Sequence, residues 1–476
     1  MNADLQRLLA AVPLHEEDDD QAALAWAADR AIPTGRFARL WTLGTMQAQI
    51  ALAYGAMWVR SFFGRSVEEV VETHLIAATK LVGCMLYLRG AVMKVGQALA
   101  AYPNIVPEEI AATLERLHFN APPMHFSLLR EQLENELDRP ISEVFAELDE
   151  RAFAAASLGQ VHRARLHSGE LVAVKIQYPG IAATIESDLR NLAAVWAPLR
   201  FTRDWESLSA QLDEIRSVLR AELDYVAEAD HIERAQSLFT PEDGIVIPRV
   251  FREHSTARVL TMELLEGKHL DAWLAGNPSQ EERDALGAKL YTASFRFYYA
   301  GRCDYADPHP GNYLFFDDGR LGVVDFGCVR SYDDEEWELL SLVDHSFYLG
   351  RQAARDAVIR YCDLSPAEAR DEERMAVLED SYRWSVEPLL QPVFDFGDPE
   401  HIRIGMEIIA RTIIHRYTRA HPLQVYLSRT FLGLRSLLHR MRARVPVAAI
   451  HEAELRRSGW EWVPVAGSVW RASSPG

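Results

Sequence analysis

The sequence predicts an α+β fold with two lobes, the first built on β-strands and the second mainly helical. The run from Glu170 to Tyr178 alternates in the way that is typical of a β-strand. From about residue 36 to 120, and again from about 269 onward, apolar residues recur with the spacing of amphipathic helices. We therefore expect a helical extension, then a strand-containing lobe, then a helical lobe.

The chain divides into four predicted parts. Pro122-Pro123 marks the first boundary, because proline cannot continue a helix. The parts are an N-terminal helical extension (1–125), an N-terminal lobe (126–266), a C-terminal lobe (267–445) and a C-terminal tail (446–476).

The N-terminal lobe is expected to contain both helices and strands. The predicted helices span 127–148 and about Trp205–Phe239, with a helical insert before the second. The predicted strands lie near Ala152–Ala156, Gln160–Leu166, Leu171–Tyr178, Ile245–Phe251 and Ala257–Glu263. In the C-terminal lobe, a pair of strands forming a hairpin is predicted to interrupt the helices, at Leu314–Phe316 and Leu321–Val324.

The acidic composition argues against nucleic acid as the main partner. There are 69 acidic and 50 basic residues, giving a formal net charge of −19. Phosphate contacts need a positively charged surface, which this balance does not supply. The cysteines are far apart and form no C-x-x-C, so neither a zinc site nor a disulfide framework is indicated, and a reducing compartment is expected. They are Cys84, Cys303, Cys328 and Cys362.

No segment has the pattern of a membrane span or a signal peptide. The most apolar stretch, from Leu75 to Tyr102, is interrupted by charged residues, whereas a spanning helix needs roughly 18 uncharged ones. The interrupting residues are Lys80, Arg89 and Lys94. The N-terminus has an acid at Asp4 and lacks the basic start and apolar core of a signal peptide. We therefore expect a cytoplasmic protein.

A catalytic segment is indicated by Asp307-Pro-His-Pro-Gly-Asn312 and, thirteen residues after Asn312, Asp325-Phe-Gly. An Asp, an Asn five positions later and a D-F-G at this spacing are typical of protein-kinase-like phosphotransferases. In such a site Asp307 orients or deprotonates the attacking hydroxyl, while Asn312 and Asp325 hold Mg²⁺ against the nucleotide phosphates. The usual H-R-D motif is absent, and Tyr305 occupies the position of its histidine. The site is therefore expected to diverge from that of ordinary protein kinases.

Val172-Ala-Val-Lys175 has the form expected for the lysine that binds the α- and β-phosphates from a strand of the N-terminal lobe. The alternative is an ordinary lysine on a strand surface. Before this strand, four residues occupy the place of a glycine-rich phosphate loop, namely Ala154, Ala155, Ala156 and Ser157. Alanine resists the backbone conformations that let a glycine loop lie on phosphates, so this loop is expected to hold its nucleotide differently.

Together these motifs resemble those of the UbiB/AarF family of atypical kinases. Two further motifs support the resemblance. Lys94-Val-Gly-Gln97 matches the K-x-G-Q motif of the family's N-terminal extension, and Glu222-Leu-Asp224 matches its E-x-D motif. Glu228 follows in the E-A context that supplies the ion-pair partner of the strand lysine. The resemblance covers roughly residues 85 to 445, with five motifs in the family's order.

The resemblance implies a two-lobed protein-kinase-like fold in which the extension folds over the nucleotide cleft. Lys94 or Gln97 would then contact the acids Glu222 and Asp224; alone, Lys94 would be read as a solvent-facing helical lysine. Asp224 and Glu228 are four residues apart and share a face if their helix is unbroken, which would turn Asp224 toward the nucleotide.

Two more segments are expected to touch the nucleotide. Met262-Glu263-Leu-Leu-Glu-Gly267 resembles the hinge between kinase lobes, so its backbone, including Glu263, would hydrogen-bond the adenine edge. His309 lies two residues past Asp307, where protein kinases commonly place a lysine that touches the γ-phosphate. A histidine carries positive charge only part of the time at neutral pH.

The resemblance implies an enzyme that binds ATP or ADP with Mg²⁺, hydrolyses ATP slowly and supports isoprenoid-lipid metabolism of the ubiquinone type. Its partners would be the nucleotide and an isoprenoid-lipid substrate or the enzymes that process it. Two alternatives stay open, a phosphotransferase acting on a small molecule or lipid, and a nucleotide-gated scaffold without turnover. After Asp325-Phe-Gly there is no A-P-E element or long activation segment, so protein kinase activity in trans is disfavoured.

A basic, amphipathic stretch from Arg411 to Arg444 is a candidate for peripheral contact with anionic membrane lipid. The alternative is a set of ordinary helices with their charges facing outward. The basic residues of this stretch are Arg411, His415, Arg416, Arg419, His421, Arg429, Arg435, His439, Arg440, Arg442 and Arg444.

Overall fold

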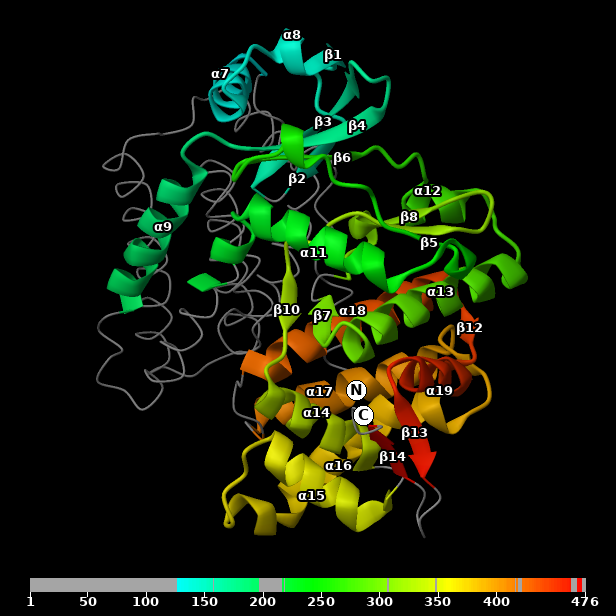
Figure 1. Cartoon of the computed structure of the whole chain (residues 1–476). Helices are drawn as coiled ribbons and strands as arrows, with labels where there is room; N and C mark the ends of the chain where they lie inside the picture. Colours follow the sequence, from blue (N-terminus) through cyan, green and yellow to red (C-terminus); the bar gives the residue numbers. More distant parts are fainter. Residues whose placement is uncertain are drawn as a thin grey trace, which may run out of the picture. The chain divides into compact units, whose positions relative to one another are not determined.

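The computed structural model describes residues 126–156, 158–196, 216–217, 219–305, 308–346, 349–415, 417, 422–463 and 469–472. The chain divides into two compact units, and the larger comprises 126–154, 159–177 and 200–476. This unit contains a lobe built on a β-sheet and a helical lobe (Figure 1), which confirms the predicted two-lobed α+β fold. The predicted extension over 1–125 lies outside the described residues, and the four-part division stays a prediction.

From Phe126 to Glu263 the elements are, in chain order, α7 (Phe126–Leu137), α8 (Ile141–Val144), β1 (Phe145–Leu148), β2 (Ala154–Ala156), β3 (Gly159–Leu166), β4 (Leu171–Gln177), α9 (Ile181–Trp196), α11 (Tyr225–Leu238), η4 (Pro241–Asp243), β5 (Ile245–Val246), η5 (Arg252–His254) and β6 (Val259–Glu263).

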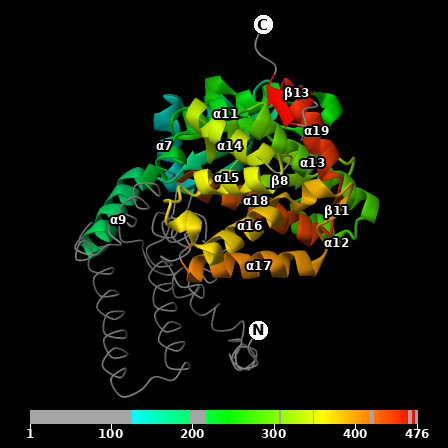
Figure 2. The same ribbon diagram turned by 90° about the horizontal axis from the view of Figure 1, so that it is seen from below.

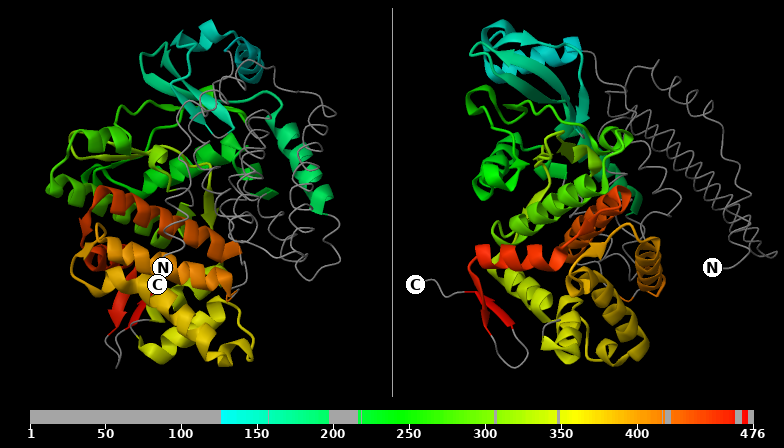
Figure 3. Two further views of the ribbon diagram at one scale, coloured as in Figure 1. Left: turned by 180° about the vertical axis from the view of Figure 1, so that it is seen from behind. Right: turned by 90° about the vertical axis from the view of Figure 1, so that its right-hand side faces the viewer.

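A five-stranded sheet forms the centre of the first lobe, with β1, β3, β4 and β6 antiparallel in that order and β2 paired with β3. Its strands lie near the top of both views in Figure 3. Strand β4 has two different faces because its side chains alternate. Val172, Val174 and Ile176 are completely buried on one face. Lys175 lies on the other face, paired in register with Val161 of β3 and with a residue of β6. The sheet therefore holds the predicted nucleotide lysine at a fixed position.

The helix predicted over 127–148 is wrong in its second half. Helix α7 ends at Leu137, and after the short α8 the chain becomes strand β1. Asp138 has a left-handed φ of 51°, and Arg139 precedes Pro140, which disfavours helical backbone at the preceding residue. Strand β1 then pairs with β3, so a tertiary contact decides the conformation of residues that have an amphipathic helical pattern.

The long helix predicted over Trp205–Phe239 is also wrong as a single element. A turn at 222–224 separates a preceding helical segment from α11, which begins at Tyr225. Asp224 is the N-cap of α11, because its carboxylate accepts hydrogen bonds from the N–H groups of Val226 at 3.1 Å and Ala227 at 3.0 Å. Residues 201–215 of the predicted helix lie outside the described residues.

The strand predicted over Ile245–Phe251 is much shorter and belongs to another sheet. Only Ile245–Val246 forms a strand, β5, which pairs in parallel with β9 (Leu321–Val323) of the second lobe. Val250 makes an isolated bridge to Met262 of β6. The segment after α11 therefore contributes to both lobes.

After β6 the elements are α12 (Leu270–Ala275), α13 (Gln280–Tyr299), β7 (Cys303–Tyr305), η6 (Pro310–Asn312), β8 (Tyr313–Phe315), β9 (Leu321–Val323), β10 (Val329–Ser331), α14 (Asp334–Ser346), α15 (Arg351–Tyr361), η8 (Glu368–Arg370), α16 (Glu372–Val386), η9 (Glu387–Leu390), β11 (Phe394–Asp395), α17 (Pro399–Ile414), α18 (Pro422–Met441), β12 (Arg444–Val445), α19 (Val447–Arg457), β13 (Trp460–Val463) and β14 (Val469–Ala472).

Helices dominate the second lobe, and α14 to α18 gather together in the view from below (Figure 2). The predicted hairpin is present as β8 and β9, with Tyr313 paired to Val323. None of the described helices combines the length and the apolar character needed to cross a bilayer.

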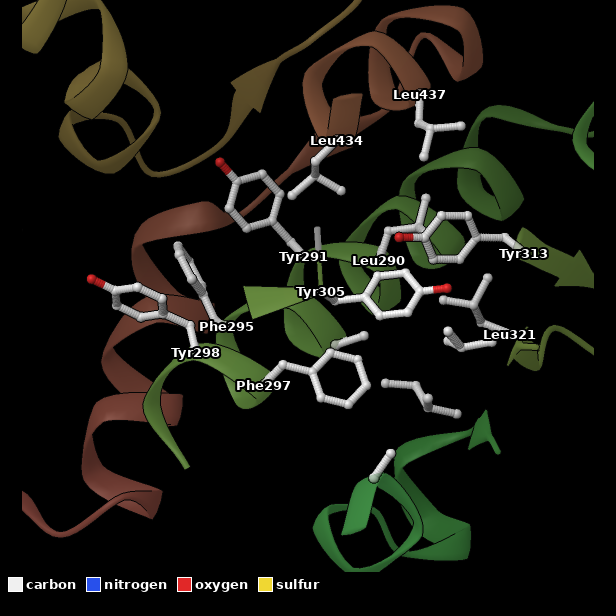
Figure 4. Close-up of a cluster of buried hydrophobic side chains, with 14 of the residues drawn as sticks. Leu290, Tyr291, Phe295, Phe297, Tyr298, Tyr305, Tyr313, Leu321, Leu434 and Leu437 are labelled. Atoms are coloured by element: carbon white, nitrogen blue, oxygen red, sulfur yellow. The ribbon is translucent and has the colours of Figure 1, made fainter. Parts of the chain in front are cut away.

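The core beneath the hairpin is rich in aromatic side chains (Figure 4). Phe297 of α13 and Tyr305 of β7 stack with ring centroids 5.7 Å apart. Tyr305 also makes edge-to-face contacts with Tyr313 at 6.1 Å and with Phe326 at 5.4 Å. The tyrosine that replaces the expected histidine therefore acts as a core residue, and its ring supports the D-F-G phenylalanine.

The smaller unit is described only in part, at Ala155, Ala156, Leu158 and 178–196. Helix α9 buries Ile181, Ile185 and Leu189, which recur every four residues and so form one face. Before this helix, the N–H of Tyr178 donates to the carbonyl of Leu158.

A buried charge cluster joins α13, α19 and η4. Arg296 is only 3% exposed and donates to both carboxylate oxygens of Glu454, at 2.6 and 2.9 Å. A third nitrogen of Arg296 lies 2.7 Å from Asp243. Because these charges are removed from water, each depends on its partners for compensation.

We predict that Glu454→Gln lowers the free energy of unfolding by about 3 kcal/mol, because it leaves the buried Arg296 with one carboxylate partner. Asp271→Asn is the matched control, since Asp271 pairs with Arg440 at the surface, where a change within about 0.5 kcal/mol is expected. Urea unfolding of both variants measures the difference. Equal unfolding midpoints for the two variants would contradict the role of the buried cluster.

Candidate functional site

Lys175 and Glu228 form a buried ion pair between the sheet and α11. The Nζ atom of Lys175 donates to Oε1 and Oε2 of Glu228 at 2.7 and 2.9 Å. Lys175 is 7% exposed and Glu228 is 2% exposed. The helix is positioned for this contact because Asp224 caps its first turn and Tyr225, also buried, packs at its start.

Burial and charge act against each other at this pair. Burial disfavours the charged lysine, but the carboxylates of Asp325 and Glu228 outweigh it and hold the pKa of Lys175 well above its usual value. Burial raises the pKa of Glu228 to about 7, although Lys175 opposes that rise. The Tyr225 ring lies 5.0 Å from the ammonium group, within the range of a cation–π contact. Such strongly perturbed groups are typical of functional sites.

Asp325 brings a second carboxylate to the lysine. Its Oδ2 atom lies 3.5 Å from the Nζ of Lys175, and its Oδ1 accepts a hydrogen bond from the N–H of Gly327 at 3.0 Å. The side chain is 33% exposed, so one edge of the carboxylate can still reach a ligand. The structure thus brings together Lys175, Glu228 and Asp325, which are separated by up to 150 positions in the chain.

The β8–β9 hairpin places Asn312 beside the D-F-G segment. The N–H of Val324 donates to the carbonyl of Asn312 at 3.1 Å, and Asp325 is the next residue. An amide oxygen and a carboxylate are hard donors that suit Mg²⁺, which usually takes few protein ligands and completes its shell with phosphates and water. The residue types therefore fit a magnesium ion. Asp307, which is predicted to orient or deprotonate the attacking hydroxyl, lies outside the described residues.

His309 takes part in the turn that precedes β8. Its Nδ1 atom accepts a hydrogen bond from the N–H of Gly311 at 3.0 Å and so caps η6. An accepting Nδ1 carries no proton, so the neutral ring keeps its proton on Nε2 and can donate from there. The predicted contact with a γ-phosphate would therefore use Nε2.

The predicted hinge, Met262–Gly267, begins within the last two residues of β6. The N–H of Glu263 donates to the carbonyl of Arg249 at 2.8 Å, and the side chain of Glu263 accepts from the N–H of Arg249 at 3.2 Å. The N–H of Leu264 donates to Leu171. Both amides are therefore engaged within the lobe. At Gly267 a Cβ atom would lie 2.8 Å from the Cβ of Leu314, so only glycine fits this close approach.

The alanine-rich segment is extended. Ala154, Ala155 and Ala156 form β2, whereas Ser157 lies outside the described residues. The glycine that follows has a steric role, because a Cβ on Gly159 would lie 2.2 Å from the carbonyl oxygen of Ile176 on β4. This glycine permits close pairing of β3 and β4.

The E-x-D motif forms the turn before α11. The carbonyl of Leu223 accepts a hydrogen bond from the side chain of Gln177 at 2.6 Å, which ties the turn to the end of β4. Asp224 caps the helix and precedes it, so the predicted shared face with Glu228 is wrong: the helix is broken there. Glu222 lies in the turn, and the predicted partners in the K-x-G-Q motif, Lys94 and Gln97, lie outside the described residues.

Sequence reasoning missed Gln177 and Tyr225. Gln177 is 2% exposed and anchors the E-x-D turn, while Tyr225 supports Lys175 with its ring. Tyr225 directly follows the E-x-D motif, and that position is the one signal that pointed to it. Gln177 has no local signal, because its contact with Leu223 spans 46 positions.

The basic stretch from Arg411 to Arg444 does not form one uniform surface in the part that the structure describes. Arg435 is 2% exposed and donates to the carbonyl of Ser385 at 2.6 Å. Two further arginines pair with acids of the same lobe, namely Arg440 with Asp271 and Arg444 with Asp284. The side chains of Arg416, Arg419, His421 and Arg429 lie outside the description.

A family model described as the ABC1 atypical kinase-like domain matches residues 116–353. Among curated proteins, the atypical kinase COQ8B, mitochondrial, of Danio rerio is 28% identical over 432 residues, which are 88% of this chain and 68% of that protein. The uncharacterized protein slr0889 of Synechocystis is 32% identical over 262 residues, or 52% of this chain. The match spans 64% of the Synechocystis protein, less than two thirds of its length.

Among solved structures, Rv3197 of Mycobacterium tuberculosis, determined in complex with erythromycin, superposes with a TM-score of 0.56. It is 25% identical, and the match covers 81% of this chain and 98% of that one. This likeness supports the predicted kinase-like fold.

We predict that Glu228→Gln lowers the free energy of unfolding by about 3 kcal/mol, because the buried ammonium group loses the carboxylate that accepts two of its hydrogen bonds. Lys175→Met combined with Glu228→Gln should be more stable than Glu228→Gln alone, since it removes the buried ammonium that would otherwise keep only the longer contact with Asp325. Asp230→Asn, in an exposed pair on the outer side of α11, is the control. Urea unfolding measures all four proteins, and a double variant less stable than the single one would contradict the account.

Proposed function

Because the chain belongs to the UbiB/AarF family of atypical kinases, we propose that it binds ATP or ADP with Mg²⁺ between its two lobes and hydrolyses ATP slowly. One observation carries the proposal. Lys175 is held charged in a buried position by Glu228, and the second carboxylate beside it, Asp325, has the position of a metal ligand in the kinase-like spacing. A kinase-like site uses such a lysine to bind the α- and β-phosphates.

In this proposal each residue has one task. Glu228 fixes the direction of the Lys175 side chain, and the ammonium group binds phosphate oxygens. Asp325 and Asn312 supply oxygen ligands to Mg²⁺, which when bound neutralises charge on the phosphate oxygens. Asp307 would orient or deprotonate the attacking water or hydroxyl. His309 would donate a hydrogen bond from Nε2 to the γ-phosphate.

The remaining predicted contacts fall at the rim of the site. The backbone of the hinge, Met262–Gly267, would hydrogen-bond the adenine edge. Because the N–H groups of Glu263 and Leu264 are engaged within the lobe, the N–H groups of Leu265 and Glu266 would make that contact. The segment Ala154–Ser157 would cover the phosphates. Lys94 and Gln97 would contact the E-x-D turn at Glu222 and Asp224 and so restrict access to the cleft.

The segment after D-F-G supports a substrate other than a protein. Val329–Ser331 forms β10 and pairs with β7, and α14 begins at Asp334. This leaves no extended activation segment on which a peptide could dock. Protein kinase activity in trans is therefore disfavoured, and a small molecule or lipid is the second candidate acceptor of the phosphoryl group.

Family membership supports a role in isoprenoid-lipid metabolism of the ubiquinone type. The protein would act in the cytoplasm and meet anionic lipid at the membrane surface through exposed basic residues such as Arg411. The ion pairs of Arg440 and Arg444 reduce the charge available for this contact. A weak, salt-sensitive membrane contact is therefore proposed.

We predict that Asp325→Asn weakens binding of Mg-ATP at least about tenfold, because it removes the carboxylate that a hard cation needs. Asp318→Asn is the control, since Asp318 is an exposed acid in the turn of the same hairpin. Thermal-shift titration with ATP and Mg²⁺ measures binding. An undiminished shift in Asp325→Asn would overturn the metal assignment.

Turnover assays in the same buffers separate the candidate functions. Release of phosphate from ATP, with and without vesicles of anionic lipid, supports the ATPase proposal. A phosphorylated lipid or small molecule would support the phosphotransferase instead. Binding without any turnover, in vesicles or in solution, would leave the nucleotide-gated scaffold.

A further inference from the structure

Helix α11 contacts the D-F-G segment at a second point, one turn after Glu228. The Nδ1 atom of His231 lies 3.2 Å from the carbonyl oxygen of Phe326. A carbonyl can only accept, so the ring donates from Nδ1. Glu228 and His231 are three positions apart and therefore lie on the same side of the helix.

Helix α11 therefore contacts the backbone of the D-F-G segment directly. The carbonyl of Phe326 accepts from His231, and Oε2 of Glu228 lies 3.6 Å from where a Cβ on Gly327 would be. The side chain of Phe326 is 1% exposed and packs edge-to-face against Phe297 at 6.0 Å and Tyr305 at 5.4 Å. The residue directly after Asp325 is therefore restrained through both its buried ring and its carbonyl.

The orientation of Asp325 depends on this same stretch of backbone. Oδ1 of Asp325 accepts from the N–H of Gly327. This N–H belongs to the same peptide group as the Phe326 carbonyl that His231 contacts. Fixing the Phe326 carbonyl fixes the next N–H as well, because the peptide group is planar. That leaves Oδ2 directed toward Lys175 at 3.5 Å.

We propose that His231 is a positioning residue for the metal ligand Asp325, acting through the Phe326 peptide. This inference rests on the proposed Mg-nucleotide site and adds a residue that no sequence motif indicated. The catalytic segment has no histidine two residues before Asp307; Tyr305 stands there and packs its ring against Phe326. Helix α11 supplies a hydrogen bond to the carbonyl of Phe326 from His231.

A second contact of α11 supports a positioning role for this face of the helix. Arg234, three residues after His231, donates to the carbonyl of Gly301 and to the hydroxyl of Ser331. Gly301 precedes β7 and Ser331 ends β10, the two strands that flank the catalytic segment and the D-F-G segment. Glu228, His231 and Arg234 therefore connect α11 to successive parts of the same loop system.

The proposed role requires that the side chain at position 231 has an N–H donor where histidine has Nδ1. Asparagine places its amide nitrogen close to where histidine has Nδ1, whereas glutamine places it one bond further out. If the Nδ1–H donor matters, His231→Asn should retain Mg²⁺ binding, while His231→Gln and His231→Ala should lose part of it. A merely space-filling role would not produce this order.

The experiment measures the Mg²⁺ concentration that half-saturates the thermal shift at fixed ATP. We expect His231→Ala and His231→Gln to need about fivefold more Mg²⁺, the usual effect of one lost hydrogen bond, and His231→Asn to need within about twofold of the wild-type amount. Nucleotide affinity in EDTA should be unchanged in all three variants. Glu233→Gln, in an exposed pair with Arg252 on the same helix, is the control and should match the wild type.

Two results would overturn the inference, namely wild-type Mg²⁺ dependence in His231→Ala, or an equal loss in all three variants. If the wild-type protein itself shows no Mg-dependent shift, the proposed function fails instead. Hydrogen exchange of peptides covering 322–331 then still tests the contact without any ligand. Faster exchange in His231→Ala than in His231→Asn supports the backbone clamp, and equal rates refute it.

Discussion

A lysine that is almost completely removed from water needs carboxylates close by, and this requirement organises the larger unit. Lys175 is 7% exposed, so its charge must be balanced from within the fold. Glu228 meets this need from α11, and Asp325 meets it from the loop after β9. A buried pair of this kind contributes little net stability, because desolvation opposes the attraction. Its value here is positional, since one ammonium group fixes the sheet, the helix and the loop relative to one another.

Helix α11 contributes to the site at successive positions along its length. Asp224 starts the helix as its N-cap, Glu228 binds the lysine, and His231 binds the backbone of the D-F-G segment. The break before Tyr225 is what allows this, because a continuous helix from Trp205 would have left no cap at Asp224. A movement of α11 would therefore change the ion pair and the position of Asp325 together.

The sequence predicted those parts of the fold and site whose signal is local. The alternation in β4, the β8–β9 hairpin and the spacing from Asn312 to Asp325 can all be read within a few residues. Pairing of Lys175 with Glu228 came from a motif comparison. The predictions failed where tertiary contacts decided the outcome, as in β1, where residues with a helical pattern pair with β3, and in β5, which joins the sheet of the other lobe. Contacts such as that of His231 with Phe326 span 95 positions and leave no pattern in one sequence.

The most direct test of the central claim is the dissociation constant of Mg-ATP for the wild-type protein and for Lys175→Met, measured by isothermal titration calorimetry. The account predicts saturable binding of one nucleotide per chain in the wild type. It predicts binding at least about tenfold weaker in Lys175→Met, because one charge-assisted phosphate contact is worth about 1.5–3 kcal/mol. Equal dissociation constants for the two proteins would contradict it, because the buried ammonium group would then have no contact with the phosphates.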